Sequence, residues 1–273
     1  MARPARTADA EGPIRIGVGG WSYDPWNETF YPAGLRKADQ LAHAASRLTA
    51  IEVNGTFYRT QTPETFAAWR AAVPAGFVLA LKAPRYAVQK RKLAEAGESI
   101  RRFTDSGIDR LGTALGPILW QLAPTKAYDP EDFAAFLDLL PAQAGDQRLR
   151  HAVELRHPSF ACEEVVAACR TRGAAIVLAA DSDYPMIADQ TADFSYLRIM
   201  GTTERYKAGY APRALDVWAR RARQLAAGQQ PEGPAPLGAP LADGTPREVF
   251  LFVISGHKAL NPLAAIELIR RVG

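Results

Sequence analysis

Eight short apolar runs recur along this chain of 273 residues, and they constrain its fold more than any other feature of the sequence. Amphipathic helix patterns lie between most of them, which is the alternation that parallel α/β folds require. An open doubly wound sheet and a closed barrel could both accommodate eight strands, but the length and the lack of an evident linker favour the barrel. We therefore predict a single (β/α)₈ TIM-type barrel, class α/β. The predicted strands are Ile14–Val18, Ala50–Val53, Phe77–Leu81, Ile118–Leu122, His151–Leu155, Ala174–Leu178, Phe194–Ile199 and Val249–Ile254.

Proline-containing start signals mark several of the intervening helices. Thr62-Pro63-Glu64 and Asp129-Pro130-Glu131 each combine an N-cap side chain, a first-turn proline and an acid near the positive helix end. Asn261-Pro262 predicts a third start of the same kind. After the second signal, apolar residues follow at the spacing of one helix face, namely Phe133, Phe136, Leu137 and Leu140.

The length and composition suit one barrel or two smaller domains, and the lack of an evident linker favours one. We expect residues 1–13 to be a disordered lead-in and residues 14–273 to form the barrel domain. The Gly- and Pro-rich stretch 228–247 precedes the eighth strand, so it predicts a long surface loop on the amino-terminal face, away from the expected site.

Targeting signals and cysteine usage favour a cytoplasmic protein. No apolar run approaches the ~20 residues that a membrane span needs, and the first ten residues lack the apolar core of a secretory signal. Cys162 and Cys169 would lie roughly 10 Å apart along a helix, which exceeds disulfide reach. We expect no membrane partner and a reducing compartment.

Charged and polar side chains sit where the apolar runs end, and α/β barrels build their sites at the carboxyl ends of the strands. Glu52, Lys82, Glu154 and His157 occupy such ends, and we predict them to be catalytic residues that exchange protons. Further polar and aromatic side chains near these ends would hold the substrate. The predicted binding residues are Trp21, Tyr23, Asn54, Tyr58, Arg156, Asp181, Arg198, Tyr206 and His257.

A structural role stays open for several of these groups. Glu52 could form an internal ion pair with Lys82 or Arg156, because buried charges need partners. Trp21 and Tyr23 could belong to a packed lid instead of a platform for a sugar ring or a base. The basic loop after the seventh strand could clamp an anion or simply be solvated.

Several common sites are absent from the sequence. There is no H-E-x-x-H, paired C-x-x-C, P-loop or G-x-S-x-G motif. The spacing of carboxylates and histidines gives no indication of a metal, so we predict no metal ligands, and the sequence identifies no cofactor.

Six segments in order along the chain resemble the domain-of-unknown-function family 72, also called YecE-like. The resemblance implies a TIM-type barrel and no settled activity. The barrel of that family is similar to those of sugar isomerases and of an apurinic endonuclease. The matching segments are Ile16–Tyr23, Phe30–Pro32, Ile51–Tyr58, Lys82–Tyr86, Leu115–Leu122 and Glu154–Ser159.

The chain departs from the commoner family pattern in two places. Met200-Gly201 stands where many relatives have a histidine before the glycine. Ile254-Ser255-Gly256-His257 stands where many carry paired asparagines. If those groups contact the ligand elsewhere in the family, the resemblance implies a different ligand or chemistry here.

The residues support three functional hypotheses. The first is an enzyme that acts on a small anionic or sugar-like substrate at the carboxyl-terminal mouth of the barrel by acid/base chemistry. The second is a nucleic-acid or polyanion binding protein without catalysis, which would use the basic run after the third strand. The third is a polar mouth that mainly stabilises itself. The formal net charge of +4 and the pI near 9.1 are compatible with an anionic ligand but do not by themselves indicate nucleic acid. The basic run comprises Arg85, Lys90, Arg91 and Lys92.

Overall fold

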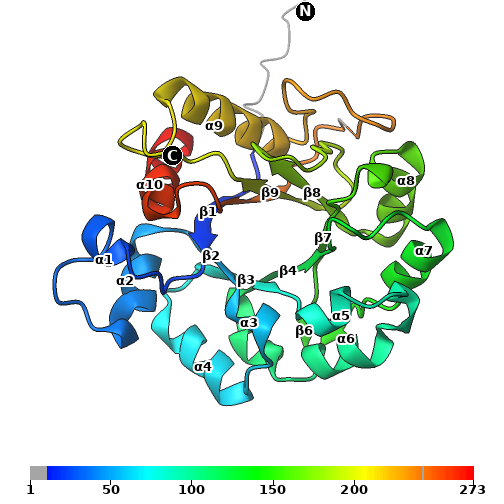
Figure 1. Cartoon of the computed structure of the whole chain (residues 1–273), viewed down its shortest axis with the longest axis horizontal. Helices are drawn as coiled ribbons and strands as arrows, with labels where there is room; N and C mark the ends of the chain where they lie inside the picture. Colours follow the sequence, from blue (N-terminus) through cyan, green and yellow to red (C-terminus); the bar gives the residue numbers. More distant parts are fainter. Residues whose placement is uncertain (1–10, 242) are drawn as a thin grey trace, which may run out of the picture.

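A closed barrel of eight parallel strands forms the centre of the protein (Figure 1). The computed structural model describes residues 11–241 and 243–273, so the first ten residues of the predicted lead-in lie outside the described residues. Each predicted run forms one barrel strand, and the (β/α)₈ prediction is confirmed. The ring runs in the order β1-β10-β9-β8-β7-β4-β3-β2. Its strands are β1 Ile14–Gly19, β2 Ala50–Val53, β3 Val78–Lys82, β4 Leu115–Gln121, β7 His151–Glu154, β8 Ala175–Ala180, β9 Phe194–Ile199 and β10 Glu248–Val253, and a separate hairpin pairs β5 Gln143–Ala144 with β6 Gln147–Arg148.

Helices surround the barrel and bury its outer face (Figure 1). Short 3₁₀ segments join several of them at Lys37–Asp39, Leu93–Glu95, Ile108–Ala114, Pro158–Phe160 and Lys258–Leu260. The helices are α1 Trp26–Thr29, α2 Gln40–Arg47, α3 Gly55–Tyr58, α4 Pro63–Ala72, α5 Arg85–Val88, α6 Gly97–Thr104, α7 Pro130–Asp138, α8 Glu163–Arg172, α9 Pro212–Ala226 and α10 Asn261–Val272.

The period of two along each strand separates two apolar layers. Ile51 and Val53 face the helices, whereas Ala50 belongs to a second buried cluster inside the barrel. The inner cluster includes Ala80, Leu119, Ala152, Tyr196 and Phe252. A polar residue lies two positions beyond most of these inner residues, on the same strand face. The pairs are Ala80 and Lys82, Leu119 and Gln121, Ala152 and Glu154, Tyr196 and Arg198, and Ala50 and Glu52. The barrel interior is therefore apolar below and charged at its carboxyl-terminal end.

The helix starts follow the predicted chemistry in two of three cases. The hydroxyl of Thr62 accepts a hydrogen bond from the Thr65 amide, and Asp129 caps α7 through the amides of Glu131 and Asp132. Asn261 differs, because it is the first residue of α10 and does not cap that helix. Its amide accepts from Thr202 Oγ1 at 2.7 Å and donates to the Ser255 carbonyl at 3.2 Å, which ties the loops after β9 and β10 together.

The described positions of segment 228–247 form no helix or strand. Asp189 holds this segment by accepting hydrogen bonds from the amides of Leu237 and Gly238, both at 2.9 Å. Asp189 precedes β9, and the segment itself runs into β10, so their contact lies at the amino-terminal end of the barrel. Within the described residues, none of the helices combines the length and hydropathy of a membrane span.

Candidate functional site

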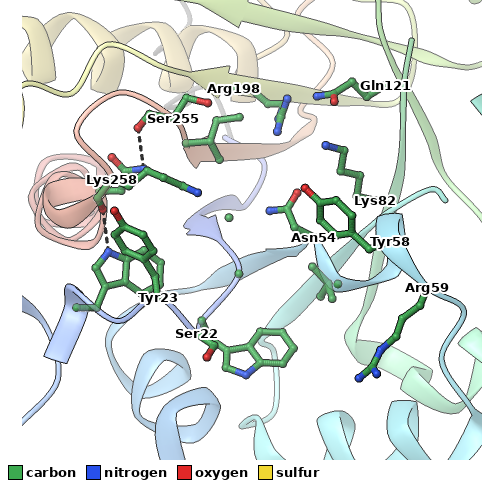
Figure 2. A pocket seen from close by; sticks show the side chains of 18 of the residues that line it. Ser22, Tyr23, Asn54, Tyr58, Arg59, Lys82, Gln121, Arg198, Ser255 and Lys258 are labelled. Atoms are coloured by element: carbon green, nitrogen blue, oxygen red, sulfur yellow. Dashed lines mark hydrogen bonds between the residues drawn. The ribbon is translucent and has the colours of Figure 1, made fainter. Parts of the chain in front are cut away.

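A cleft of about 770 Å³ opens at the carboxyl-terminal end of the barrel (Figure 2). The loop after β1 forms one wall, α3 and α4 form another, and the segment between β10 and α10 closes a third side. The polar ends of β3, β4 and β9 and the residues just beyond β7 supply the floor. The floor side chains that reach the cleft are Lys82, Gln121, Arg156 and Arg198.

Arg198 organises the floor through two carboxylates that lie beneath the cleft. Its Nε and Nη2 atoms donate to the two oxygens of Glu52, each at 3.0 Å, and its Nη1 atom donates to Glu154 Oε2 at 2.5 Å. The hydroxyl of Tyr196 also donates to Glu52, at 2.8 Å. Glu52 and Glu154 are fully buried, and Arg198 is 4% exposed. Burial disfavours the charged form of Arg198, but the two carboxylates outweigh it and raise the pKa of the guanidinium.

Glu154 is held as a carboxylate by several donors. Gln121 donates to its Oε2 atom at 2.5 Å, and Arg156 Nη2 donates to its Oε1 atom at 3.3 Å. Burial opposes ionisation of this group, yet the positive charges of Arg198 and Arg156 and the hydrogen bond from Gln121 hold the pKa of Glu154 below its ordinary value. The predicted internal pairing of Glu52 with Lys82 or Arg156 is not formed; Arg198 takes that role.

Lys82 ends β3 and reaches the cleft with its ammonium group. The residue is 9% exposed, and its Nζ atom lies 4.2 Å from the ring centroid of Phe57. Among the described residues, Nζ forms no hydrogen bond or ion pair. Burial, together with the positive charge of Arg198, lowers the pKa of Lys82 to about 8, and the negative charges of Glu52 and Glu154 offset only part of that effect.

Arg156 reaches the cleft from just beyond β7, and a neighbouring loop supports it. Its guanidinium lies 4.2 Å over the ring of Tyr184, and Nη1 donates to the Tyr184 hydroxyl at 3.2 Å. Its Nε atom is buried without a partner among the described residues. Arg156 therefore lines the cleft with a guanidinium that has one unsatisfied donor, buried behind the cleft surface.

Aromatic rings form the wall opposite this charged floor. Trp21 and Trp69 make an edge-to-face contact with centroids 5.3 Å apart, and Tyr23 contacts the buried Trp26 at 5.7 Å. Trp26 is fixed further by its indole N–H, which donates to the Lys258 carbonyl at 2.8 Å. Trp26 is almost fully buried and packs as part of the wall. Trp21 and Tyr23 are half-buried and line the cleft, where their rings are accessible to a ligand.

The backbone at the end of β1 lies close to the side chains of Asn54 and Ile254 at the entrance to the cleft. A Cβ atom on Gly19 would lie 2.8 Å from Asn54 Nδ2 and 3.1 Å from Ile254, so a larger residue would displace the Asn54 amide. Ser255 holds a positive φ of 58° in the loop after β10. Such a conformation is uncommon for a residue other than glycine, and here it is accompanied by the Asn261 and Thr202 contacts described above.

Seven of the predicted binding or catalytic side chains gather around this cleft, and two more lie directly beneath it. The lining set is Trp21, Tyr23, Asn54, Tyr58, Lys82, Arg156 and Arg198. The pair beneath it is Glu52 and Glu154.

The other four predicted residues lie outside the lining. His157 accepts the Ser159 amide at 3.2 Å and caps a 3₁₀ turn. Asp181 accepts hydrogen bonds from Tyr210 at 2.8 Å and from Trp218 at 3.2 Å, so it anchors the loop after β9. Tyr206 is half-buried within that loop, and His257 is exposed after β10.

Several lining residues were missed in the sequence. Gln121 ends β4 as Lys82 ends β3, and it is the one polar residue within the predicted run Ile118–Leu122, so its polarity could have identified it. Tyr196 was missed as well; it lies beneath the cleft, where it donates to Glu52, and it precedes Arg198 by two on the same strand face. Trp69, Arg59 and Lys258 come from helices and loops, where no sequence pattern marked them.

Metal binding has no visible site in the described ranges. In residues 11–241 and 243–273, no three His, Cys, Asp or Glu side chains gather closely enough to hold an ion. The carboxylates nearest the cleft are already bound by arginine.

The chain matches the sequence model of one protein family. A family model described as "Protein of unknown function DUF72" matches residues 15–272. The chain belongs to the DUF72 family. None of the curated proteins is significantly similar to it in sequence.

Solved structures of DUF72 proteins have the same fold. A DUF72 protein from Enterococcus faecalis V583 superimposes with a TM-score of 0.71 over 95% of each chain, at 16% identity. Another from Thermotoga maritima MSB8 gives a TM-score of 0.68 at 18% identity, over 94% of this chain and 98% of that one. A structure titled SacUVDE gives 0.54 at 8% identity, over 95% and 99%. At these identities the likeness establishes the barrel and no activity.

The two departures from the commoner DUF72 pattern occupy different positions relative to the cleft. Met200 is buried in the barrel, next to Gly201. Ser255 lines the cleft, whereas His257 does not. Of the two segments, the one after β10 therefore contributes to the lining of the cleft.

Proposed function

We propose that this DUF72 protein is an enzyme that binds a small anionic molecule in the cleft and acts on it by acid/base chemistry, with Lys82 as the group that exchanges the proton. A sugar-like or aromatic portion of the substrate would lie against Trp21 and Tyr23. This proposal locates the site at the carboxyl-terminal mouth, the usual place in such barrels.

The charge of the lining carries the proposal. Among the described residues, the ionised side chains that line the cleft are all cationic: Arg59, Lys82, Arg156, Arg198 and Lys258. The nearest carboxylates, Glu52 and Glu154, are fully buried beneath the floor. A concave site lined by one sign of charge concentrates and orients an anion.

Lys82 suits proton exchange better than the two glutamates. Each oxygen of Glu52 and Glu154 already accepts at least one hydrogen bond from a neighbouring side chain. Proton transfer requires a group within hydrogen-bond reach of the substrate and a pKa near the working pH. The position of Lys82 in the cleft lining and the lowering of its pKa to about 8 support this role, whereas the glutamates hold Arg198 in position.

The polyanion alternative has less support. The basic run Arg85, Lys90, Arg91 and Lys92 contributes none of the cleft-lining residues. The enclosed floor and aromatic wall are typical of a small-molecule site.

Calorimetric titration with phenyl phosphate and with glucose 6-phosphate tests the proposal, and glucose serves as the uncharged control. We expect the anions to bind and the Arg156→Met and Lys82→Met proteins to bind them more weakly. Arg85→Met, which removes an exposed charge outside the cleft, is the matched control. Binding that is equal in all four proteins would place the anion elsewhere and contradict the proposal.

A further inference from the structure

The nitrogen of Lys82 is available for bond formation as well as for proton exchange. Its neighbours at the floor engage one another: Arg198 binds both glutamates, and Gln121 donates to Glu154. Figure 2 shows the Lys82 side chain directed into the cleft with its amino end near Arg198 and Gln121, and without a drawn hydrogen bond. The amino group lies over the ring of Phe57. An aromatic ring, unlike a carboxylate, does not form an ion pair with the amino group.

We infer that Lys82 is a nucleophile that forms an imine with the carbonyl carbon of an α-oxo acid bound in this cleft. The inference rests on the proposed function, since it uses the same anion-binding floor. It goes further by naming the substrate class and a covalent intermediate.

The environment provides what such a lysine requires. An amine attacks a carbonyl only when it is unprotonated, and neighbouring cations together with burial favour that form. Arg198 and Arg156 both disfavour the ammonium form of Lys82 by their charge. In an α-oxo acid the carboxylate adjoins the carbonyl, so the arginines that activate the amine can also bind the substrate.

The reaction balances without any further reagent. The lone pair of Nζ forms the new C–N bond while the carbonyl π electrons move to oxygen, which takes up one proton from the amine. Loss of that oxygen as water, with the second amine proton, leaves the C=N bond. The net change is one amine and one carbonyl converted to one imine and one water.

The aromatic wall narrows the choice of probe. Trp21 and Trp69 present ring surfaces above the floor, which would pack against a planar substituent on the oxo acid. Phenylpyruvate combines such a ring with the ketone and the carboxylate. Phenyllactate has the same ring and carboxylate but carries a hydroxyl in place of the ketone.

Borohydride trapping tests the inference on the full-length protein. Wild-type protein is incubated with phenylpyruvate and sodium cyanoborohydride, which reduces an imine to a stable secondary amine without reducing the free ketone, and the adduct is mapped by peptide mass spectrometry. We expect one adduct, on Lys82, that phenyllactate suppresses by competition. Lys82→Arg keeps the positive charge but should lose the adduct, whereas Lys92→Met, which changes an exposed lysine, should retain it.

The outcomes separate this inference from the proposed function. Trapping at other lysines, or equal trapping in Lys82→Arg, would overturn the nucleophile assignment. Calorimetric binding of phenyllactate without any phenylpyruvate adduct would also overturn it, while leaving the anion-binding proposal intact. Failure of both phenyllactate and phenyl phosphate to bind would remove both.

Discussion

Arg198 and Glu52 form a two-point pair inside the barrel, with Nε–Oε2 and Nη2–Oε1 distances of 3.0 Å. The pair joins β9 to β2, and β10 and β1 lie between these two strands in the ring. It therefore spans the lumen instead of linking neighbouring strands. Glu154 on β7 completes the cross-connection.

Removing the cation of this cluster should destabilise the fold. Arg198→Met leaves two buried carboxylates without their main partner, and we expect a loss of about 3–5 kcal/mol in the free energy of unfolding. Urea denaturation measures the effect. Arg85→Met, an exposed charge, is the control and should change stability little. A loss for Arg198→Met no larger than that of the control would show that the cluster does not depend on this pair.

Lys82 should make stability depend on pH in the alkaline range. Its pKa falls from an ordinary 10.5 to about 8 on folding. Between pH 8 and pH 10.5 the unfolded chain holds a proton that the folded protein has released. The free energy of unfolding therefore increases as the pH rises through this range. Lys82→Met should be more stable than wild type at pH 7 by about 1–3 kcal/mol.

The same comparison at higher pH checks the sign. The advantage of Lys82→Met should shrink as pH rises from 8 to 10.5, because neutral lysine no longer carries the cost of burial. Lys92→Met, an exposed substitution, should show no such trend. A stability difference that stays constant with pH would mean that Lys82 is not perturbed by its surroundings.

Anion affinity should fall over the pH range in which Lys82 loses its proton. Sulfate keeps its charge throughout this range, so a weaker complex above pH 8 reports the protein. We expect roughly a tenfold decrease for wild type, equivalent to about 1.4 kcal/mol, and none for Lys82→Met. Calorimetric titration at pH 7 and pH 9 measures both. An unchanged wild-type affinity would argue that Lys82 does not contact the anion.

His151 should contribute to acid sensitivity. The indole of Trp120 donates to its Nδ1 atom at 3.0 Å, which leaves Nε2 to donate to the Pro141 carbonyl at 2.8 Å in the neutral ring. Burial lowers the pKa of His151 to about 4. Its contribution to stability is present above the ordinary pKa of 6.5 and is lost as pH falls through about 4.

His151→Gln removes the titrating group while keeping an acceptor and a donor. Both proteins should lose free energy of unfolding between pH 7 and pH 4. We expect the loss for His151→Gln to be smaller than the loss for wild type by about 2–3 kcal/mol. Denaturation at both pH values measures the difference, and His43→Gln on α2 is the matched histidine control. Identical acid profiles for wild type and His151→Gln would mean that the buried ring does not control acid unfolding.

The sequence predicts the barrel well because its period-two pattern is local. Ala50, Glu52 and Asn54 occupy alternate positions, which already separates one strand face from the other. The partner of Glu52 is not local: Arg198 lies 146 residues away, and their contact depends on closure of the whole ring. From residue charge alone, Lys82 and Arg156 were equally good candidates for the ion-pair partner of Glu52.

Loop residues were harder to predict for a related reason. Asp181 directly follows β8 and Glu154 ends β7, but at Asp181 a positive φ of 55° accompanies contacts with Tyr210 and Trp218. Asn261 precedes a proline, as Thr62 does, yet its amide joins two loops. In both cases a polar residue of similar chemistry stood at a similar place in the pattern, and tertiary contacts decided the role.

The Asp189 anchor holds the 228–247 segment at the rim opposite the cleft. Changes of length in that segment should be accommodated without moving the floor residues, because loop closure adds only a slowly growing entropic term. This makes it a permissive attachment point for a fluorescent reporter or an immobilisation tag, with ligand entry left unobstructed.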